Sequence, residues 1–181
     1  EVKSVSGRAY RVEIRSLDEL QNSCTCPDYK TNLIGTCKHI EFALVALEKK
    51  RGAKAALMRG YQPPFSELYL RYDCGRTVHF RAGTDCPPAL VKAARKLFDP
   101  AQGWQLPPEQ FDRLERFLAT VAKSGHELRA YDDALDFVAS RSDAERRSMM
   151  LDGIFPRGAR DPQLKKLLKV PLYPYQMEGA L

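Results

Sequence analysis

The sequence has no segment that would anchor the chain in a membrane or carry it across one. Its 181 residues include no signal peptide, no apolar run of membrane length and no lipidation motif. There is also no internal repeat and no low-complexity tract, which excludes solenoid and fibrous architectures. The apolar content of 44% is ordinary for a globular protein. The length allows one large or two small hydrophobic cores.

The sequence also lacks the residues that a nucleotide hydrolase needs. It contains no Gly-x-x-x-x-Gly-Lys-Ser/Thr phosphate loop and no acidic metal-binding box after one. Of its three histidines, His79 and His126 have no obvious nucleophile or carboxylate partner in the sequence. We therefore expect no enzymatic activity from this chain.

Two short pairs of residues are the most informative feature that is present. A Cys-x-Cys pair, Cys24 and Cys26, precedes a Cys-x-His pair, Cys37 and His39. Structural zinc sites take about four such sulfur and nitrogen ligands in a tetrahedron. Because the protein supplies all four ligands, no coordination position is left for water. The pattern therefore predicts a structural Zn²⁺ that performs no chemistry.

The residues around the two pairs favour this arrangement. Pro27 follows Cys26 directly and favours the tight bend that presents both sulfurs of the first pair. A helix is expected to begin near Cys37, with Thr36 as its cap. The exposed amides at the start of that helix favour the thiolate form of Cys37.

Two other interpretations of the cysteines are weaker. Buried cysteines that act only as small apolar residues would not explain the matched spacing with a histidine. Disulfides fit poorly because two cysteines separated by one residue cannot bridge without strain. Cys74, His79 and Cys86 could suggest a second metal site, but they lack a fourth ligand and the short pair spacing. We expect these three to be packing or surface residues.

The string CTCPDYKTNLIGTCKHI resembles the SWIM zinc finger, whose pattern is Cys-x-Cys, a variable stretch and Cys-x-His. The resemblance covers about residues 3–50 and includes the aromatic residue after Cys-Pro and the Lys-His-Ile run. It implies that Cys24, Cys26, Cys37 and His39 are the zinc ligands. It also implies binding to DNA or to a protein, without indicating which.

The first 60 residues are predicted to form a ββα module held by the metal. Residues 2–5 and 9–15 are expected as two short strands joined by Ser6-Gly7-Arg8, and the second alternates apolar and charged residues. From Lys38 to about Lys50, apolar residues fall at the spacing of one helix face. They are Ile40, Ala43, Leu44 and Leu47. Such a unit is too small to be stable by burial alone, so metal binding and folding should be coupled.

Residues 61–169 are predicted to form a mainly helical domain that begins with a β-hairpin over residues 68–72 and 77–80. Helices are expected over residues 89–98, from Pro107 to Gly125, over 132–139 with Asp132 or Asp133 as cap, and from a Ser142 cap to about Leu151. The predicted fold class is therefore α+β.

The last residues, VPLYPYQMEGAL, resemble the motif that opens the ATPase core of SWI/SNF-type helicase-like proteins. Leu172, Tyr175 and Gly179 fit that pattern. The resemblance implies that Gln176 contacts the adenine of ATP, and an amide suits a base edge because it both donates and accepts. Residues 170–181 would then begin the motor, and ATP and Mg²⁺ would bind only in the intact parent protein. Because the chain begins with Glu1 rather than methionine, we expect it to be a fragment. The resemblance at its end implies that it is the N-terminal portion of such an ATPase, of the bacterial type.

The charge of the chain is compatible with nucleic acid. The formal net charge is +6 and the pI is about 9.1. Lys49, Lys50, Arg51 and Lys54 form a basic run that either contacts phosphates or is a solvated helix end. The leading hypothesis is a DNA-binding or protein-binding accessory region of the motor, and the alternative is a protein-interaction module that does not touch DNA.

The cysteine content indicates where the protein resides. Five cysteines, three of them assigned to zinc, point to a reducing compartment. We therefore expect a cytoplasmic protein with no membrane partner, associated with the nucleoid if its source is bacterial.

Overall fold

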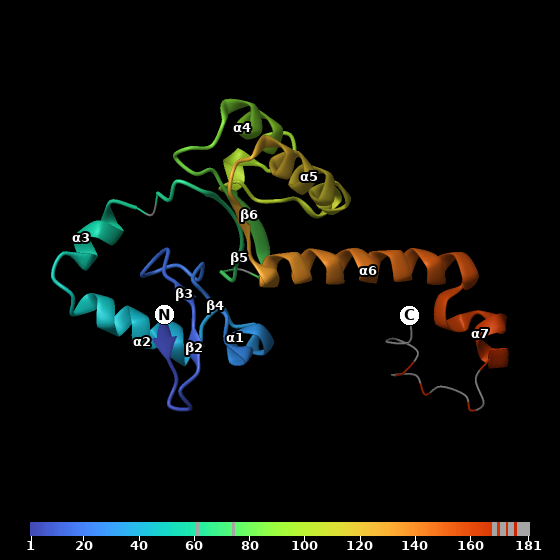
Figure 1. The fold of residues 1–181 in the computed structure, drawn as a ribbon. Coiled ribbons are helices and arrows are strands. Elements are labelled where there is room, and N and C mark those ends of the chain that lie inside the picture. The colour runs from blue at the N-terminus through green and yellow to red at the C-terminus, as the bar shows by residue number, and fades with distance from the viewer. Residues whose placement is uncertain (61, 74, 168–169, 171–172, 174–175, 177–181) are drawn as a thin grey trace. The chain divides into compact units, whose positions relative to one another are not determined.

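The computed structural model describes residues 1–60, 62–73, 75–167, 170, 173 and 176, and shows a mixed α and β fold with small sheets (Figure 1). The chain divides into two compact units, residues 1–136 and 137–181. Within the described residues, no helix combines the length and apolar character needed to cross a membrane.

The N-terminal strands are shorter than predicted. Strand β1 (Val2–Lys3) pairs antiparallel with β2 (Ala9–Tyr10), and β3 (Val12–Glu13) pairs antiparallel with β4 (Ser23–Cys24). The expected single strand over residues 9–15 changes partner at Arg11, whose amide donates to Thr25 Oγ1. The expected alternation of packed apolar residues with solvent-facing charged residues also fails at Arg15, which is buried.

Three helices follow β4. Helix α1 (Pro27–Asn32) was not predicted, whereas α2 (Lys38–Glu48) confirms the expected helix and ends two residues before Lys50. The expected cap at Thr36 is wrong, because Cys37 is the N-cap residue and the Thr36 hydroxyl instead contacts the Glu41 carboxylate. Helix α3 (Ala53–Met58) comes after a turn at residues 50–52.

The hairpin predicted for the second region is present and belongs to a three-stranded sheet of order β6-β5-β7. Strand β5 (Ser66–Arg71) pairs antiparallel with β6 (Thr77–Arg81), with Tyr69 opposite His79. Strand β7 (Leu128–Ala130), which was not predicted, runs parallel to β5. Its three residues offer too short a pattern to be identified in the sequence.

An aromatic core lies between the sheet and the helices that follow it. These are α4 (Pro88–Ala94), the 3₁₀ turns η1 (Pro100–Gln102) and η2 (Pro108–Arg113), and α5 (Leu114–Ser124). The Phe80 ring lies 5.2 Å from Phe98 and 5.7 Å from Phe117, between centroids.

The helix predicted after Pro107 is 3₁₀ in its first turns, which form η2. It ends as expected at Gly125, with φ 72°.

The segments on either side of residue 60 share buried polar contacts. Arg15 Nη2 lies 3.0 Å from Glu67 Oε1, and both side chains are fully buried. The hydroxyls of Tyr29 and Tyr72 both donate to Asp133 Oδ2, each at 3.3 Å. The N-terminal module and the sheet therefore lie in one compact unit, and the predicted boundaries at residues 60 and 169 stay predictions.

The second unit contains most of α6 (Asp132–Ile154), with η3 (Gly158–Arg160) and α7 (Pro162–Leu167) after it. The two helices expected over residues 132–151 are one continuous helix, and Ser142 lies inside it rather than at a cap. No glycine or proline interrupts residues 132–152, so nothing in the backbone forces a break.

Candidate metal centre

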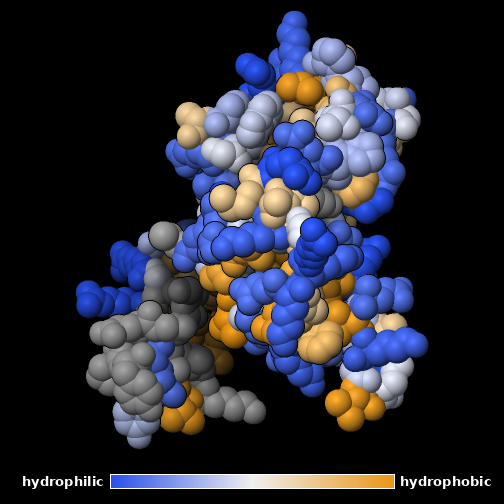
Figure 2. All heavy atoms as spheres, turned by 90° about the vertical axis from the view of Figure 1, so that its left-hand side faces the viewer, coloured by the Kyte–Doolittle hydropathy of each residue, from blue (hydrophilic) through white to orange (hydrophobic). Residues whose placement is uncertain are grey.

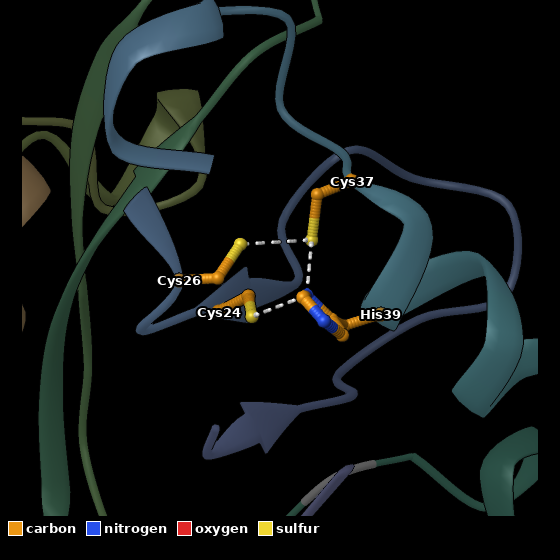
Figure 3. A group of neighbouring side chains, drawn as sticks. All are labelled: Cys24, Cys26, Cys37 and His39. Carbon is orange, nitrogen blue, oxygen red and sulfur yellow. Dashed lines mark hydrogen bonds between the residues drawn. The ribbon is translucent and has the colours of Figure 1, made fainter. Parts of the chain in front are cut away.

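Four side chains converge from three elements at the N-terminal end of α2 (Figure 3). Cys24 ends β4, and Cys26 is the N-cap residue of α1. Cys37 is the N-cap residue of α2, and His39 lies in its first turn. The two predicted pairs, separated by a loop and a short helix in the chain, therefore meet at one point.

The donor atoms of these four residues have the spacing of a tetrahedral site. They all lie within 4.8 Å of one another. Cys26 Sγ is 3.6 Å from Cys37 Sγ, and His39 Nδ1 is 3.9 Å from Cys24 Sγ and 4.0 Å from Cys37 Sγ. Four ligands at about 2.3 Å from a central zinc would be separated by about 3.8 Å. The cluster can therefore hold a metal ion such as zinc without a large rearrangement.

The loop between the two pairs is fixed by close packing. The amide of Tyr29 donates to Cys26 Sγ at 3.3 Å, so the sulfur caps α1. Gly35 has φ 79°, and a Cβ atom there would lie 2.6 Å from the Tyr72 side chain. Only glycine fits that position without displacing the ring.

All four candidate ligands are buried, with exposed fractions between 1% and 5%. Burial raises the pKa of the Cys24 thiol to about 12. Burial also raises the pKa of Cys37, while the backbone amides of Ile40 and His39 lower it. The thiols of Cys24 and Cys37 are therefore neutral unless a cation is bound beside them, and metal binding has to release their protons.

The environment of His39 also fits a metal. Its Nδ1 faces the sulfurs, whereas Nε2 is buried and has no hydrogen-bond partner within the described residues. The ring lies 4.8 Å from that of Tyr10, between centroids. A metal bound at Nδ1 would leave the ring proton on Nε2, so the fit to a metal rests on the direction of Nδ1 toward the sulfurs. The donor set of three thiols and one imidazole suits zinc.

The remaining cysteines and histidines do not form a second centre among the described residues. His79 lies between Thr77 Oγ1, at 2.9 Å from Nε2, and the Gly103 carbonyl, at 3.0 Å from Nδ1. Cys86 is half-buried and lies outside the cluster, and Cys74 lies outside the described residues. His79 thus links β6 to the η1 turn, which is a packing role.

His126 has a serine partner that the sequence did not reveal. Its Nε2 lies 2.8 Å from Ser66 Oγ. Ser66 is fully buried, and its hydroxyl oxygen already accepts the Gly83 amide. A nucleophile has to reach its substrate, so this Ser–His pair supports the fold rather than catalysis.

The structure places the other predicted site residues on the surface. Lys49, Lys50, Arg51 and Lys54 are exposed at the end of α2 and the start of α3. Gln176 is also exposed, and its side-chain oxygen accepts the Tyr173 amide at 3.0 Å. The motif residues Leu172, Tyr175 and Gly179 lie outside the described residues.

Comparison of the chain with protein-family models, with curated proteins and with solved structures gives no match. The resemblance to the SWIM finger and to the SWI/SNF-type motor therefore rests on the residue patterns alone.

Proposed function

We propose that this chain is a zinc-binding accessory region of a SWI/SNF-type DNA-dependent ATPase, in which the metal stabilises the fold and the chain itself hydrolyses nothing. The observation that carries the metal assignment is the buried cluster of Cys24, Cys26, Cys37 and His39, with donor atoms within 4.8 Å. The assignment to the motor is supported by the residue pattern from Val170 to Leu181.

DNA binding is the leading activity of this accessory region. It is supported by the net charge of +6 and by the resemblance to SWIM fingers. Contacts from lysine to phosphate hold a duplex without reading its sequence. With this modest charge we expect weak binding, on the order of micromolar or poorer at physiological salt.

One surface feature favours the alternative, a protein-interaction module. A hollow of about 610 Å³ between α2, α3 and Leu17 is lined by apolar side chains that include Leu44, Val45 and Met58. Figure 2 shows apolar side chains exposed on the face that carries these helices. The hollow is rimmed by Asp18, Glu41, Glu48 and Lys54. This excess of carboxylates favours a partner helix with basic flanks.

A fluorescence titration of the zinc-loaded chain with duplex and single-stranded oligonucleotides separates the two functions. DNA binding through phosphates should weaken steeply as salt rises, whereas an apolar protein interface responds little. Similar affinity for unrelated sequences, with a strong salt dependence, is the expected result. Absence of DNA binding even at low salt would contradict the DNA-binding function and leave the protein-interaction module.

A further inference from the structure

Four exposed cations from two separate segments line one groove beside the aromatic core. Lys92 and Lys96 come from α4 and the turn after it, while Arg113 and Arg116 come from the end of η2 and from α5. Helices α4 and α5 lie next to each other (Figure 1). Cations that are about 20 residues apart in the sequence are therefore brought together by this packing.

The lining of the groove contains no carboxylate. Its volume is about 310 Å³, and the remaining lining residues are apolar or small: Ala89, Ala93, Leu97, Phe117 and Thr120. Leu97 and Phe117 are buried and form its floor. Asp112 and Glu115 are neighbours in sequence but do not line it.

The four cations are not neutralised by neighbours. Among the described residues none of them forms an ion pair, and Arg113 donates only to the uncharged Gln110, at 3.1 Å. Like charges that are held together without a counter-charge repel one another, and a bound anion relieves that repulsion. The groove therefore has the charge of a site for a polyanion.

The basic run at residues 49–54 is a weaker candidate. Lys54 lines the hollow rimmed by the carboxylates of Asp18, Glu41 and Glu48, which repel phosphates. The run was visible in the sequence because its four cations lie within residues 49–54. The groove was not, because its members are spread over residues 92–116.

We propose that the groove formed by Lys92, Lys96, Arg113 and Arg116 binds the phosphate backbone of nucleic acid. This proposal rests on the DNA-binding function proposed above and names the residues at which the nucleic acid would bind. Guanidinium groups can hold phosphate oxygens in pairs, and ammonium groups act as point charges. No side chain of the groove offers both a donor and an acceptor for a base edge except the Thr120 hydroxyl, so binding should not depend on sequence.

The test compares two double variants that remove the same charge. The groove variant carries Lys92→Gln and Arg116→Gln. The 50/54 variant carries Lys50→Gln and Lys54→Gln in the basic run. A 20-base-pair duplex is titrated from 50 to 200 mM salt, where about four phosphate contacts predict about a hundredfold loss of affinity for the wild type. Circular dichroism and zinc content confirm that each variant is folded.

The groove variant should bind at least tenfold more weakly at 50 mM salt, and its salt slope should fall by about two units. The 50/54 variant should change little. Loss of binding only in the 50/54 variant would overturn the assignment of the groove as the binding site, but the DNA-binding function would stand. No binding by the wild type would overturn both. Stronger binding to polyglutamate, or to vesicles containing phosphatidylserine, than to the duplex would assign the groove to an acidic protein or a membrane surface and overturn the proposal.

Discussion

Arg15 and Glu67 form a salt bridge in which both side chains are fully buried, with 3.0 Å between Nη2 and Oε1. The same guanidinium donates to the Gln21 carbonyl and lies over the Tyr131 ring, with its carbon 4.4 Å from the centroid. Tyr131 in turn donates its hydroxyl hydrogen to Glu67. This network ties the strand region before the metal centre to the middle strand of the sheet.

Replacing Arg15 with methionine should therefore be strongly destabilising. Among the described residues, the buried Glu67 carboxylate would then keep the Tyr131 hydroxyl and the more distant Arg81, at 3.4 Å. Removing one partner of a buried ion pair costs about 3–5 kcal/mol of unfolding free energy. Urea denaturation followed by circular dichroism measures the loss.

Arg11→Met is the matched control for that variant. Arg11 is 62% exposed and pairs with Glu13 at 3.6 Å. Because the Arg11 guanidinium is exposed to water, removing it should change the unfolding free energy by only about 0–1 kcal/mol. Equal effects of the two substitutions would show that the buried pair does not link the segments.

Loss of the metal should weaken the sheet as well as the N-terminal module. The chain has one tryptophan, Trp104, whose ring lies 5.9 Å from that of Phe80 in the aromatic core. The metal-binding loop packs at Gly35 against Tyr72, the residue that follows β5 of the sheet. Treatment with a chelator is expected to lower the urea midpoint reported by Trp104 fluorescence. Chelator saturated with zinc is the control, and an unchanged midpoint would mean that the sheet folds independently of the metal.

Stability should fall at mildly acidic pH through His79. Burial lowers the pKa of His79 from 6.5, so the unfolded chain binds a proton more readily than the folded one. The contribution of neutral His79 is complete above about pH 6.5 and is lost as the pH falls below it, by at most about 1.4 kcal/mol per pH unit.

The difference in unfolding free energy between wild type and His79→Gln isolates this effect. It should be constant above about pH 7 and shrink below pH 6.5. Other titrating groups, including the metal ligands, largely cancel in the difference. A difference that stays constant down to pH 5 would show that His79 is protonated without cost in the folded state.

The chain alone should not turn over ATP. It lacks a phosphate loop, and an amide such as Gln176 can contact a base but cannot hold the phosphates. ATP turnover in the presence of duplex DNA is expected to equal that of the Gln176→Ala variant. Higher turnover by the wild type would contradict this.

Structural features that depend on a short stretch of sequence could be predicted. The cysteine and histidine spacing identified the four residues that the structure brings together, and the turn at residues 73–76 identified the hairpin of β5 and β6. Gly125 marked the end of α5 because a left-handed residue there needs no side chain.

Features that depend on distant partners could not be predicted. Arg15 looked solvent-facing because its partner Glu67 is 52 residues away. The parallel strand β7 has only three residues, and α1 lies inside the stretch treated as a variable loop. Likewise, the cations of the α4–α5 groove become neighbours only through helix packing.

The metal content of protein purified without added metal tests the proposed zinc site. Elemental analysis should give about one zinc per chain, because the four buried donors form one closed site. Cys37→Ala should lose the zinc and unfold the N-terminal module, while Cys86→Ala, which changes a thiol outside the cluster, should keep both. A well-folded wild-type protein that contains no zinc, and whose Cys24 and Cys26 are freely alkylated, would contradict a structural zinc site.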